Sequence, residues 1–129
     1  MNQIEFYEAK LKYEIDSWDL SEAINKNDNV IIVDARSNEA YTVEHIPSAV
    51  NIPHKFMSIE TTKDLEKSKV YVTYCDGIGC NASTKGAVNL TKLGFKVKEL
   101  LGGLDWWKRD GHATEGKGSV KSAKIECGC

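Results

Sequence analysis

Two apolar runs constrain the fold of this chain more than any other feature of its sequence. The segments VIIVD (30–34) and VYVTY (70–74) consist almost entirely of β-branched and aromatic residues. Continuous runs of this kind are typical of strands that are covered on both faces, as in a parallel sheet. We expect shorter strands at 13–15, 49–52 and 97–100.

Helix-compatible segments alternate with these strands, at 4–12, about 17–25, 38–44, 82–93 and 104–110. Alternation of strands and helices predicts the α/β class, with a mostly parallel central sheet and helices on both faces. The length of 129 residues corresponds to one ordinary domain.

The end segments of the chain differ from its centre. We expect the folded domain to cover residues 1–112, with a helical extension over about residues 1–16. The segment 113–129 is rich in Gly, Lys, Ser and Ala, so we expect it to be a flexible tail that carries two cysteines. His112 stands just before this tail and is expected to be solvated.

Composition and charge narrow the class of function. Hydrophobic residues make up 41% and charged residues 28% of the chain, which is the balance of a soluble globular protein. The formal net charge of −2 gives no electrostatic reason to bind nucleic acid or an anionic membrane. The N-terminal segment is interrupted by charges and does not resemble a secretory signal. We therefore expect a cytoplasmic protein.

Four cysteines form two close pairs, Cys75 with Cys80 and Cys127 with Cys129. A chain of this size without an export signal does not need a disulfide scaffold. Close pairs of cysteines in such a chain indicate reactivity or metal binding.

The loop after the second apolar run has the features of a reactive site. Cys75 follows the run directly, and ligands of open α/β sheets bind beyond the carboxyl ends of the strands. The loop leads into the N-terminus of the 82–93 helix, where free N–H groups and the helix dipole favour an anion. Gly77 and Gly79 let the loop curl around that anion. In such a cradle Cys75 should be partly thiolate, which is the nucleophilic form.

Cys80 lies five positions after Cys75 and allows several interpretations. It can serve as a resolving thiol, as an acceptor of a transferred sulfur, or simply as part of the loop wall.

Four further stretches, taken in order, resemble a known family. They are VIIVDARSNEAY, EHIPSAVNIP, YVTYC and LGFKVKELLGGLDWWKRDG, and together they span residues 18–111. The chain resembles single-domain rhodanese-like proteins, in the subset whose loop reads C-x-G-x-x-C-N. The resemblance implies a three-layer fold around a five-stranded, mostly parallel sheet. It also implies that Cys75, which matches the family's catalytic cysteine, carries sulfur as a persulfide.

The loop departs from the common family pattern C-x-x-G-x-R-S. It reads CDGIGCNAS, is two residues longer up to Ser83, and contains no arginine. A dianion such as thiosulfate therefore loses a charge-assisted bidentate contact worth about 1.5–3 kcal/mol. Asp76 adds a negative charge that opposes both this dianion and the thiolate, and Lys85 compensates for it only in part. We expect weak thiosulfate activity.

The missing arginine also disfavours a second activity of this fold. Rhodanese-like phosphatases and related arsenate reductases resemble this chain in loop length, but their loop has the form C-x5-R. Phosphoryl transfer depends on electrostatic stabilisation of the equatorial oxygens, which this loop lacks.

Several other residues are interpreted as architectural. We expect Arg36 to form a structural network with Asp34, Glu39 or Glu44, although a role at the site edge stays open. His54 is placed near the pocket rim. Gly102 and Gly103 are expected to permit close backbone approach to the cysteine loop. One of Trp106 and Trp107 is expected in the core. His45 is expected to be a hydrogen-bonded structural residue.

The tail cysteines, Cys127 and Cys129, leave several alternatives open. They can bind a soft metal ion, form a small-ring disulfide, accept sulfur from Cys75, or have no role. Two thiolates alone do not complete a tetrahedral zinc site.

The sequence thus predicts a sulfurtransferase that needs no metal or organic cofactor. Cys75 takes sulfur from thiosulfate, a small persulfide or a protein persulfide, and passes it to a thiol acceptor. The persulfide is expected to be stabilised by N–H groups of the substrate-binding loop: Asp76, Gly77, Ile78, Gly79, Cys80, Asn81 and Ala82. Two alternatives remain, a thiol redox protein that uses Cys75 with Cys80 or a tail cysteine, and a non-catalytic module for partner binding or metal delivery.

Overall fold

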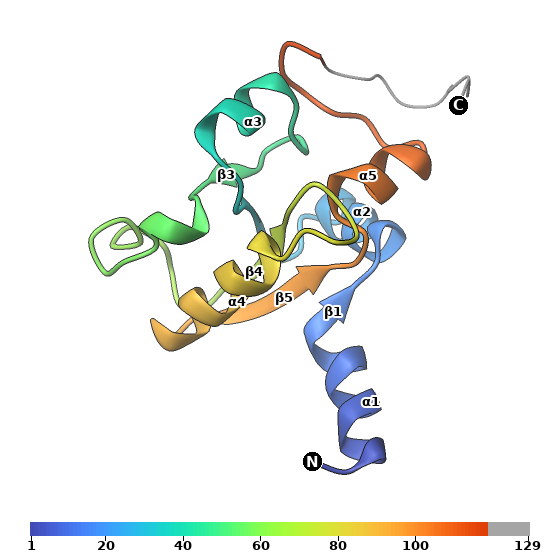
Figure 1. Ribbon diagram of the computed structural model, residues 1–129, viewed down its shortest axis with the longest axis vertical. Coiled ribbons are helices and arrows are strands. Elements are labelled where there is room, and N and C mark those ends of the chain that lie inside the picture. Colours follow the sequence, from blue (N-terminus) through green and yellow to red (C-terminus); the bar gives the residue numbers. More distant parts are fainter. Residues whose placement is uncertain (119–129) are drawn as a thin grey trace.

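The computed structural model of the protein describes residues 1–118 and contains one five-stranded sheet (Figure 1). The strands run in the spatial order β1-β5-β4-β2-β3, and every neighbouring pair is parallel. Their bounds are β1 Glu14–Ile15, β2 Val30–Asp34, β3 Val50–Asn51, β4 Val70–Tyr74 and β5 Lys96–Leu100. The predicted α/β class and parallel sheet are confirmed.

The two continuous apolar runs form the adjacent central strands β2 and β4. Their register pairs Val30 with Val70 at one end and Asp34 with Tyr74 at the other. Because parallel strands end at the same edge of a sheet, this register places the residues after Asp34 and after Tyr74 side by side. Cys75 is the residue after Tyr74.

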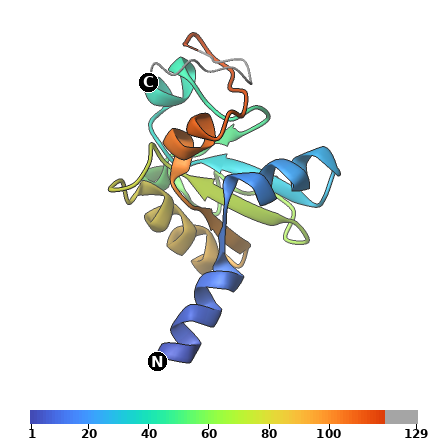
Figure 2. The same ribbon diagram turned by 90° about the vertical axis from the view of Figure 1, so that its right-hand side faces the viewer.

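Helices cover both faces of the sheet (Figure 2). Residues Leu90 of α4 (Ala82–Lys92), Val33, Tyr71 and Phe95 form the core on one face. The core on the other face includes Leu20 of α2 (Ser17–Asn25), Val72, and Leu104 and Trp107 of α5 (Gly103–Arg109). Trp107 is buried and Trp106 is 42% exposed, so the prediction of one core tryptophan is confirmed. Two further elements lie in the connection from β2 to β4: α3 (Asn38–Val43) precedes β3, and the 3-10 helix η1 (His54–Phe56) follows it.

The first helix, α1 (Gln3–Tyr13), projects from the domain below β1 (Figures 1 and 2). It begins with a capping box, in which Asn2 accepts from the Glu5 N–H and Glu5 accepts from the Asn2 N–H. None of its residues is buried, and Ile4 and Leu11 of its predicted apolar face are 70% and 83% exposed. The helix is present as predicted, but that face packs against no core.

Residues 113–118 correct the expectation of a loosely held tail. The backbones of His45 and Glu115 exchange two hydrogen bonds of 2.8 and 2.9 Å. The Thr114 hydroxyl donates to a Glu44 carboxylate oxygen at 2.7 Å, and the Gly118 N–H donates to the Val43 carbonyl at 2.7 Å. This segment is therefore packed beside the end of α3. Cys127 and Cys129 lie outside the described residues.

His112 is not fully solvated as predicted, but partly buried beside two tryptophan rings. Its ring lies 4.5 Å from the Trp18 ring and 4.4 Å from the Trp107 ring, measured between centroids. Its Nε2 atom lies 3.1 Å from the Ser17 hydroxyl oxygen. Burial lowers the pKa of His112, although the nearby Asp110 carboxylate acts in the opposite direction. The sequence did not predict the contacts with Trp18 and Ser17, because these two residues lie at the opposite end of the domain's sequence.

No helix within residues 1–118 is long and apolar enough to span a membrane.

Candidate active site

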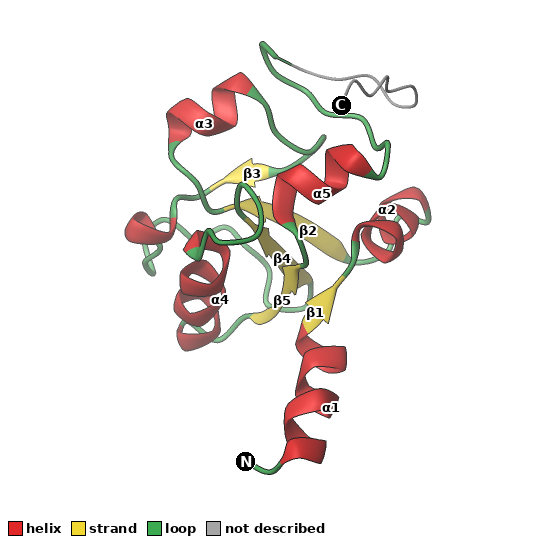
Figure 3. Ribbon diagram, turned by 45° about the vertical axis from the view of Figure 1, so that its right-hand side comes forward, coloured by secondary structure: helices red, strands yellow, loops and turns green. Residues whose placement is uncertain are grey.

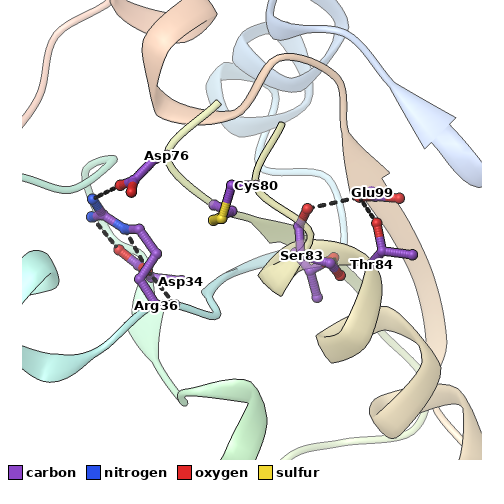
Figure 4. Close-up of a disulfide and its surroundings, with 9 residues drawn as sticks. Asp34, Arg36, Asp76, Cys80, Ser83, Thr84 and Glu99 are labelled. Carbon is purple, nitrogen blue, oxygen red and sulfur yellow. Dashed lines mark hydrogen bonds and ion pairs between the residues drawn. A yellow bond between two sulfur atoms is a disulfide. The ribbon is translucent and has the colours of Figure 1, made fainter. Parts of the chain in front are cut away.

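Cys75 follows the carboxyl end of β4 and is joined by a disulfide to Cys80, which is labelled in Figure 4. Cys75 is 2% exposed, whereas Cys80 is partly exposed, and their Cα atoms are 6.3 Å apart. The Cys80 N–H donates to the Gly77 carbonyl at 3.2 Å, which closes the turn between them. The disulfide joins two residues of one loop and does not cross-link separate elements of the fold. The described form of the loop is therefore the oxidised one.

The start of α5 holds the backbone of the cysteine loop (Figure 3). The Leu104 N–H donates to the Cys75 carbonyl at 2.9 Å, and the Asp105 N–H donates to the Asp76 carbonyl at 2.8 Å. This approach requires glycine at Gly103, because a Cβ atom there would lie 2.5 Å from the Cys75 carbonyl oxygen. Gly103 also has a φ of 58°, in the left-handed region. The predicted role of this glycine in close backbone approach is confirmed.

Arg36 connects the carboxyl end of β2 to the cysteine loop (Figure 4). Its guanidinium donates to both carboxylate oxygens of Asp34 at 3.0 and 2.7 Å, and to the Asp76 carboxylate at 2.9 Å. A further bond of 2.6 Å goes to the Glu44 carbonyl. Asp34 is one of the predicted partners, Glu44 takes part only through its backbone carbonyl, and the bond to Asp76 was not predicted.

Tyr74 completes this buried network. Its hydroxyl donates to Asp34 at 2.7 Å and accepts from the Ile46 N–H at 3.0 Å. Burial raises the pKa of Tyr74, and the neighbouring Asp34 carboxylate raises it further. Tyr74 was predicted only as part of the strand, because nothing in a strand pattern distinguishes a tyrosine with a buried, hydrogen-bonded hydroxyl.

The charges of this network change the expected electrostatics of the loop. Asp76 does not stand as a free negative charge, because Arg36 pairs with it. Arg36 is in turn shared with Asp34, so two carboxylates face one guanidinium. Arg36 therefore cannot replace the missing loop arginine as a free cation for a dianionic substrate.

A cavity of about 800 Å³ opens on one side of the disulfide. Its lining includes Arg36, Asp76, Cys75, Cys80, Asn51 and His54. Burial lowers the pKa of His54, and the positive charges of Lys85 and Lys55 lower it further. Lys85 is exposed, and its positive charge reaches this cavity through its effect on His54.

A smaller cavity of about 220 Å³ lies beside Cys75 and Cys80 at the start of α4. Here Glu99 accepts hydrogen bonds from the Ser83 hydroxyl at 2.7 Å and the Thr84 hydroxyl at 2.6 Å. The Glu99 carboxylate thus lies beside the N-terminus of α4, where an anion-binding site was predicted. It already compensates part of the partial positive charge at that end of the helix.

The remaining loop residues are placed as follows. Ile78 is 80% exposed, and Gly79 is exposed with a φ of 96°. Asn81 is exposed at the N-cap of α4 without a capping side-chain bond, and Ala82 is the first residue of that helix.

One group of metal-ligand atoms occurs within residues 1–118. The donor atoms of Cys75, Asp76 and Cys80 all lie within 4.8 Å of one another. Two of the three donors are consumed by the disulfide and the third is paired with Arg36. Metal binding here would require reduction of the disulfide and release of Asp76.

The fold and this loop define a class of α/β domains in which a cysteine follows a central parallel strand and precedes a helix. Family comparison identifies the class, because the model of the rhodanese-like domain matches residues 18–110. The chain belongs to the rhodanese-like domain family.

Curated relatives and solved structures agree with this assignment. The chain is 32% identical over 96 residues to the thiosulfate sulfurtransferase GlpE of Coxiella burnetii, covering 73% of this chain and 82% of that protein. It is 26% identical to the adenylyltransferase and sulfurtransferase UBA4 of Candida albicans, of which only 24% is covered. The crystal structure of the BH2092 protein from Bacillus halodurans is 44% identical, with a TM-score of 0.87, over 93% of this chain and 88% of that one.

Proposed function

We propose that this protein is a sulfurtransferase that carries sulfane sulfur on Cys75. The observation that carries the proposal is the position of Cys75 at the carboxyl end of β4, in the lining of the 800 Å³ cavity. Similarity to a protein named thiosulfate sulfurtransferase supports it. The active form requires reduction of the Cys75–Cys80 disulfide, because only a free thiolate is a nucleophile.

In the proposed reaction, the Cys75 thiolate attacks the outer sulfur of a donor R–S–SH. The bond between the donor's two sulfurs breaks, RS⁻ leaves with the electron pair, and Cys75–S–SH forms. Loop N–H groups between Asp76 and Ala82, apart from the Cys80 N–H that donates to the Gly77 carbonyl, stabilise the charge on the bound sulfur, and no metal or organic cofactor takes part. A thiol acceptor then removes the outer sulfur.

The charges around the loop favour a small persulfide or a protein persulfide over thiosulfate as donor. Asp34 and Asp76 share one guanidinium, and Glu99 stands at the start of α4. A dianion meets this excess of carboxylates, whereas a persulfide brings at most one negative charge.

Intact-mass spectrometry of the reduced chain tests the proposal. After brief treatment with glutathione persulfide or thiosulfate, Cys80→Ser should gain one sulfur, roughly 32 Da, because its Cys75 thiolate is free to attack. The gain should be smaller with thiosulfate. Cys75→Ser is the matched control and should gain nothing at this site. Failure of Cys80→Ser to gain sulfur from either donor contradicts the proposal.

The Cys75–Cys80 disulfide also supports a thiol redox function as a second candidate. In that function, mild peroxide oxidises Cys75 to a sulfenic acid, which Cys80 resolves. Peptide mapping after peroxide treatment should then show a dominant Cys75–Cys80 linkage while glutathione persulfide transfers no sulfur.

A further inference from the structure

We propose that Cys80 discharges the Cys75 persulfide as sulfide, which gives the domain a persulfide-reducing activity. This inference rests on the proposed function, because it needs sulfur on Cys75. It differs in its product: the sulfur leaves as HS⁻ and is not handed to an external acceptor as sulfane sulfur.

The first support is that Cys80 reaches the inner sulfur of the persulfide. In Cys75–S–SH the inner sulfur is the Cys75 Sγ atom, and Cys80 Sγ is bonded to that same atom in the structure. The loop backbone thus accommodates attack at this position, held by the Cys80 N–H bond to Gly77 and by the α5 bonds to Cys75 and Asp76. A thiol held this close acts at a high effective concentration.

The second support is access. Cys75 lines the 800 Å³ cavity, through which an external donor reaches it, whereas Cys80 reaches the Cys75 Sγ atom from within the same loop. Cavities of about 800 and 220 Å³ both include Cys75 and Cys80 in their lining. They provide space beside the two cysteines for the departing sulfur.

The third support is the charge around the loop. Arg36 is shared by Asp34 and Asp76, and Glu99 lies at the start of α4 beside the smaller cavity. Among these groups the anionic outer sulfur gains no ion pair, so only loop N–H groups hold it, and its departure as HS⁻ breaks no salt bridge.

The step balances in atoms and electrons. The Cys80 thiolate forms a bond to Cys75 Sγ, and the bond between Cys75 Sγ and the outer sulfur breaks. The electron pair of that bond leaves with the outer sulfur, which departs with its hydrogen as HS⁻. The outer sulfur is reduced from sulfane to sulfide, and the two cysteine thiols are oxidised to the disulfide seen in the structure.

A dithiol reductant restores the thiols. Its first thiolate attacks the partly exposed Cys80 sulfur, so Cys75 leaves as the thiolate, and its second thiol resolves the mixed disulfide. The reductant becomes a disulfide, and Cys75 is ready for another donor.

A single-turnover experiment on the full chain tests this activity. Reduced protein, freed of reductant under anaerobic conditions, receives one equivalent of glutathione persulfide, and sulfide and intact mass are measured. The wild type should release one sulfide per chain and lose about 2 Da as the disulfide forms. Cys80→Ser should keep a gain of roughly 32 Da and release sulfide at least tenfold more slowly. Dithiothreitol should then return the wild type to its reduced mass.

The outcomes separate this inference from the function on which it rests. If the wild type keeps the added sulfur and releases no sulfide, or if Cys80→Ser releases it as fast as the wild type, the inference is wrong and the carrier role of Cys75 stands. If Cys80→Ser gains no sulfur at all, the proposed function itself fails. Release that is lost in the Cys127→Ser/Cys129→Ser double variant, but kept in Cys80→Ser, would assign the discharge to the tail thiols.

Discussion

At the scale of single residues, the site depends on the buried Asp34 carboxylate, which is neutralised and hydrogen-bonded by residues from different parts of the chain. Asp34 is fully buried, and it is neutralised by Arg36 and bonded by Tyr74. Arg36 also binds Asp76. Its guanidinium therefore neutralises the buried Asp34 carboxylate and also positions the residue that follows Cys75. The geometry of the cysteine loop is thereby linked to the packing of the core.

Tyr74→Phe tests this link through stability. The substitution leaves the buried Ile46 N–H without its acceptor and removes one donor from Asp34, so we expect a loss of about 1–3 kcal/mol. Urea unfolding measures the free energy change. Tyr7→Phe, at a side chain that is 53% exposed, is the matched control and should change stability by less than about 0.5 kcal/mol. Equal effects of the two substitutions would contradict the role of the Tyr74 hydroxyl.

At the scale of elements, the site is made where β4 ends and α5 begins. The two segments are remote in sequence, yet the first N–H groups of α5 hold the carbonyls of Cys75 and Asp76. Gly103 is the residue that allows this contact, both by its positive φ and by its missing side chain. The loop is therefore shaped as much by α5 as by its own glycines.

Gly103→Ala should disrupt sulfur loading of Cys75. The new methyl group would lie 2.5 Å from the Cys75 carbonyl oxygen and 2.9 Å from the Gly77 nitrogen, so the loop must shift. We expect at least a tenfold slower gain of mass from glutathione persulfide, measured in a Cys80→Ser background.

Gly111→Ala provides the comparison. Gly111 has a φ of 91° with no atom within 4 Å of an added Cβ, so this change introduces backbone strain of about 1–2 kcal/mol without a clash. It should lower stability while Cys75 loads at the normal rate. A loading defect as large as that of Gly103→Ala would mean that strain alone explains the effect.

These elements also show what the sequence could predict. The bounds of β2 and β4 were predicted without error because continuous buried runs are a strong local signal. The bond between Arg36 and Asp76 spans 40 residues and that between Thr114 and Glu44 spans 70, and no local pattern encodes such contacts. The roles of individual loop residues stay predictions, because they concern chemistry rather than packing.

At the scale of the whole molecule, the segment after α5 ties separate parts of the domain together. His112 lies between α2 and α5, and residues 113–118 run beside the end of α3. The stability of the domain is consequently coupled to the protonation of a partly buried histidine.

We expect stability to fall as the pH drops below about 6.5. The pKa of His112 is lowered in the folded state by burial, so the unfolded chain binds the proton first. The contribution of neutral His112 to the free energy of unfolding is complete above the ordinary histidine pKa. It is lost as the pH falls towards the lower pKa of His112 in the folded state. His54, whose pKa is also lowered, acts in the same direction.

Urea midpoints at pH 7.5 and pH 5.5 measure this effect. The midpoint of the wild type should be lower at the acidic pH, and His112→Gln should reduce the difference between the two. An unchanged difference in His112→Gln would assign the pH dependence to other groups.

The position of α1 has a practical consequence. This helix precedes β1 and therefore extends from the amino-terminal edge of the parallel sheet (Figure 3). Cys75, by contrast, directly follows β4 at the carboxyl edge. An anchor attached at Met1 is thereby separated from the cysteine loop by the length of the sheet and of α1. The protein can be immobilised on a sensor surface through that end with the loop still accessible from the solution.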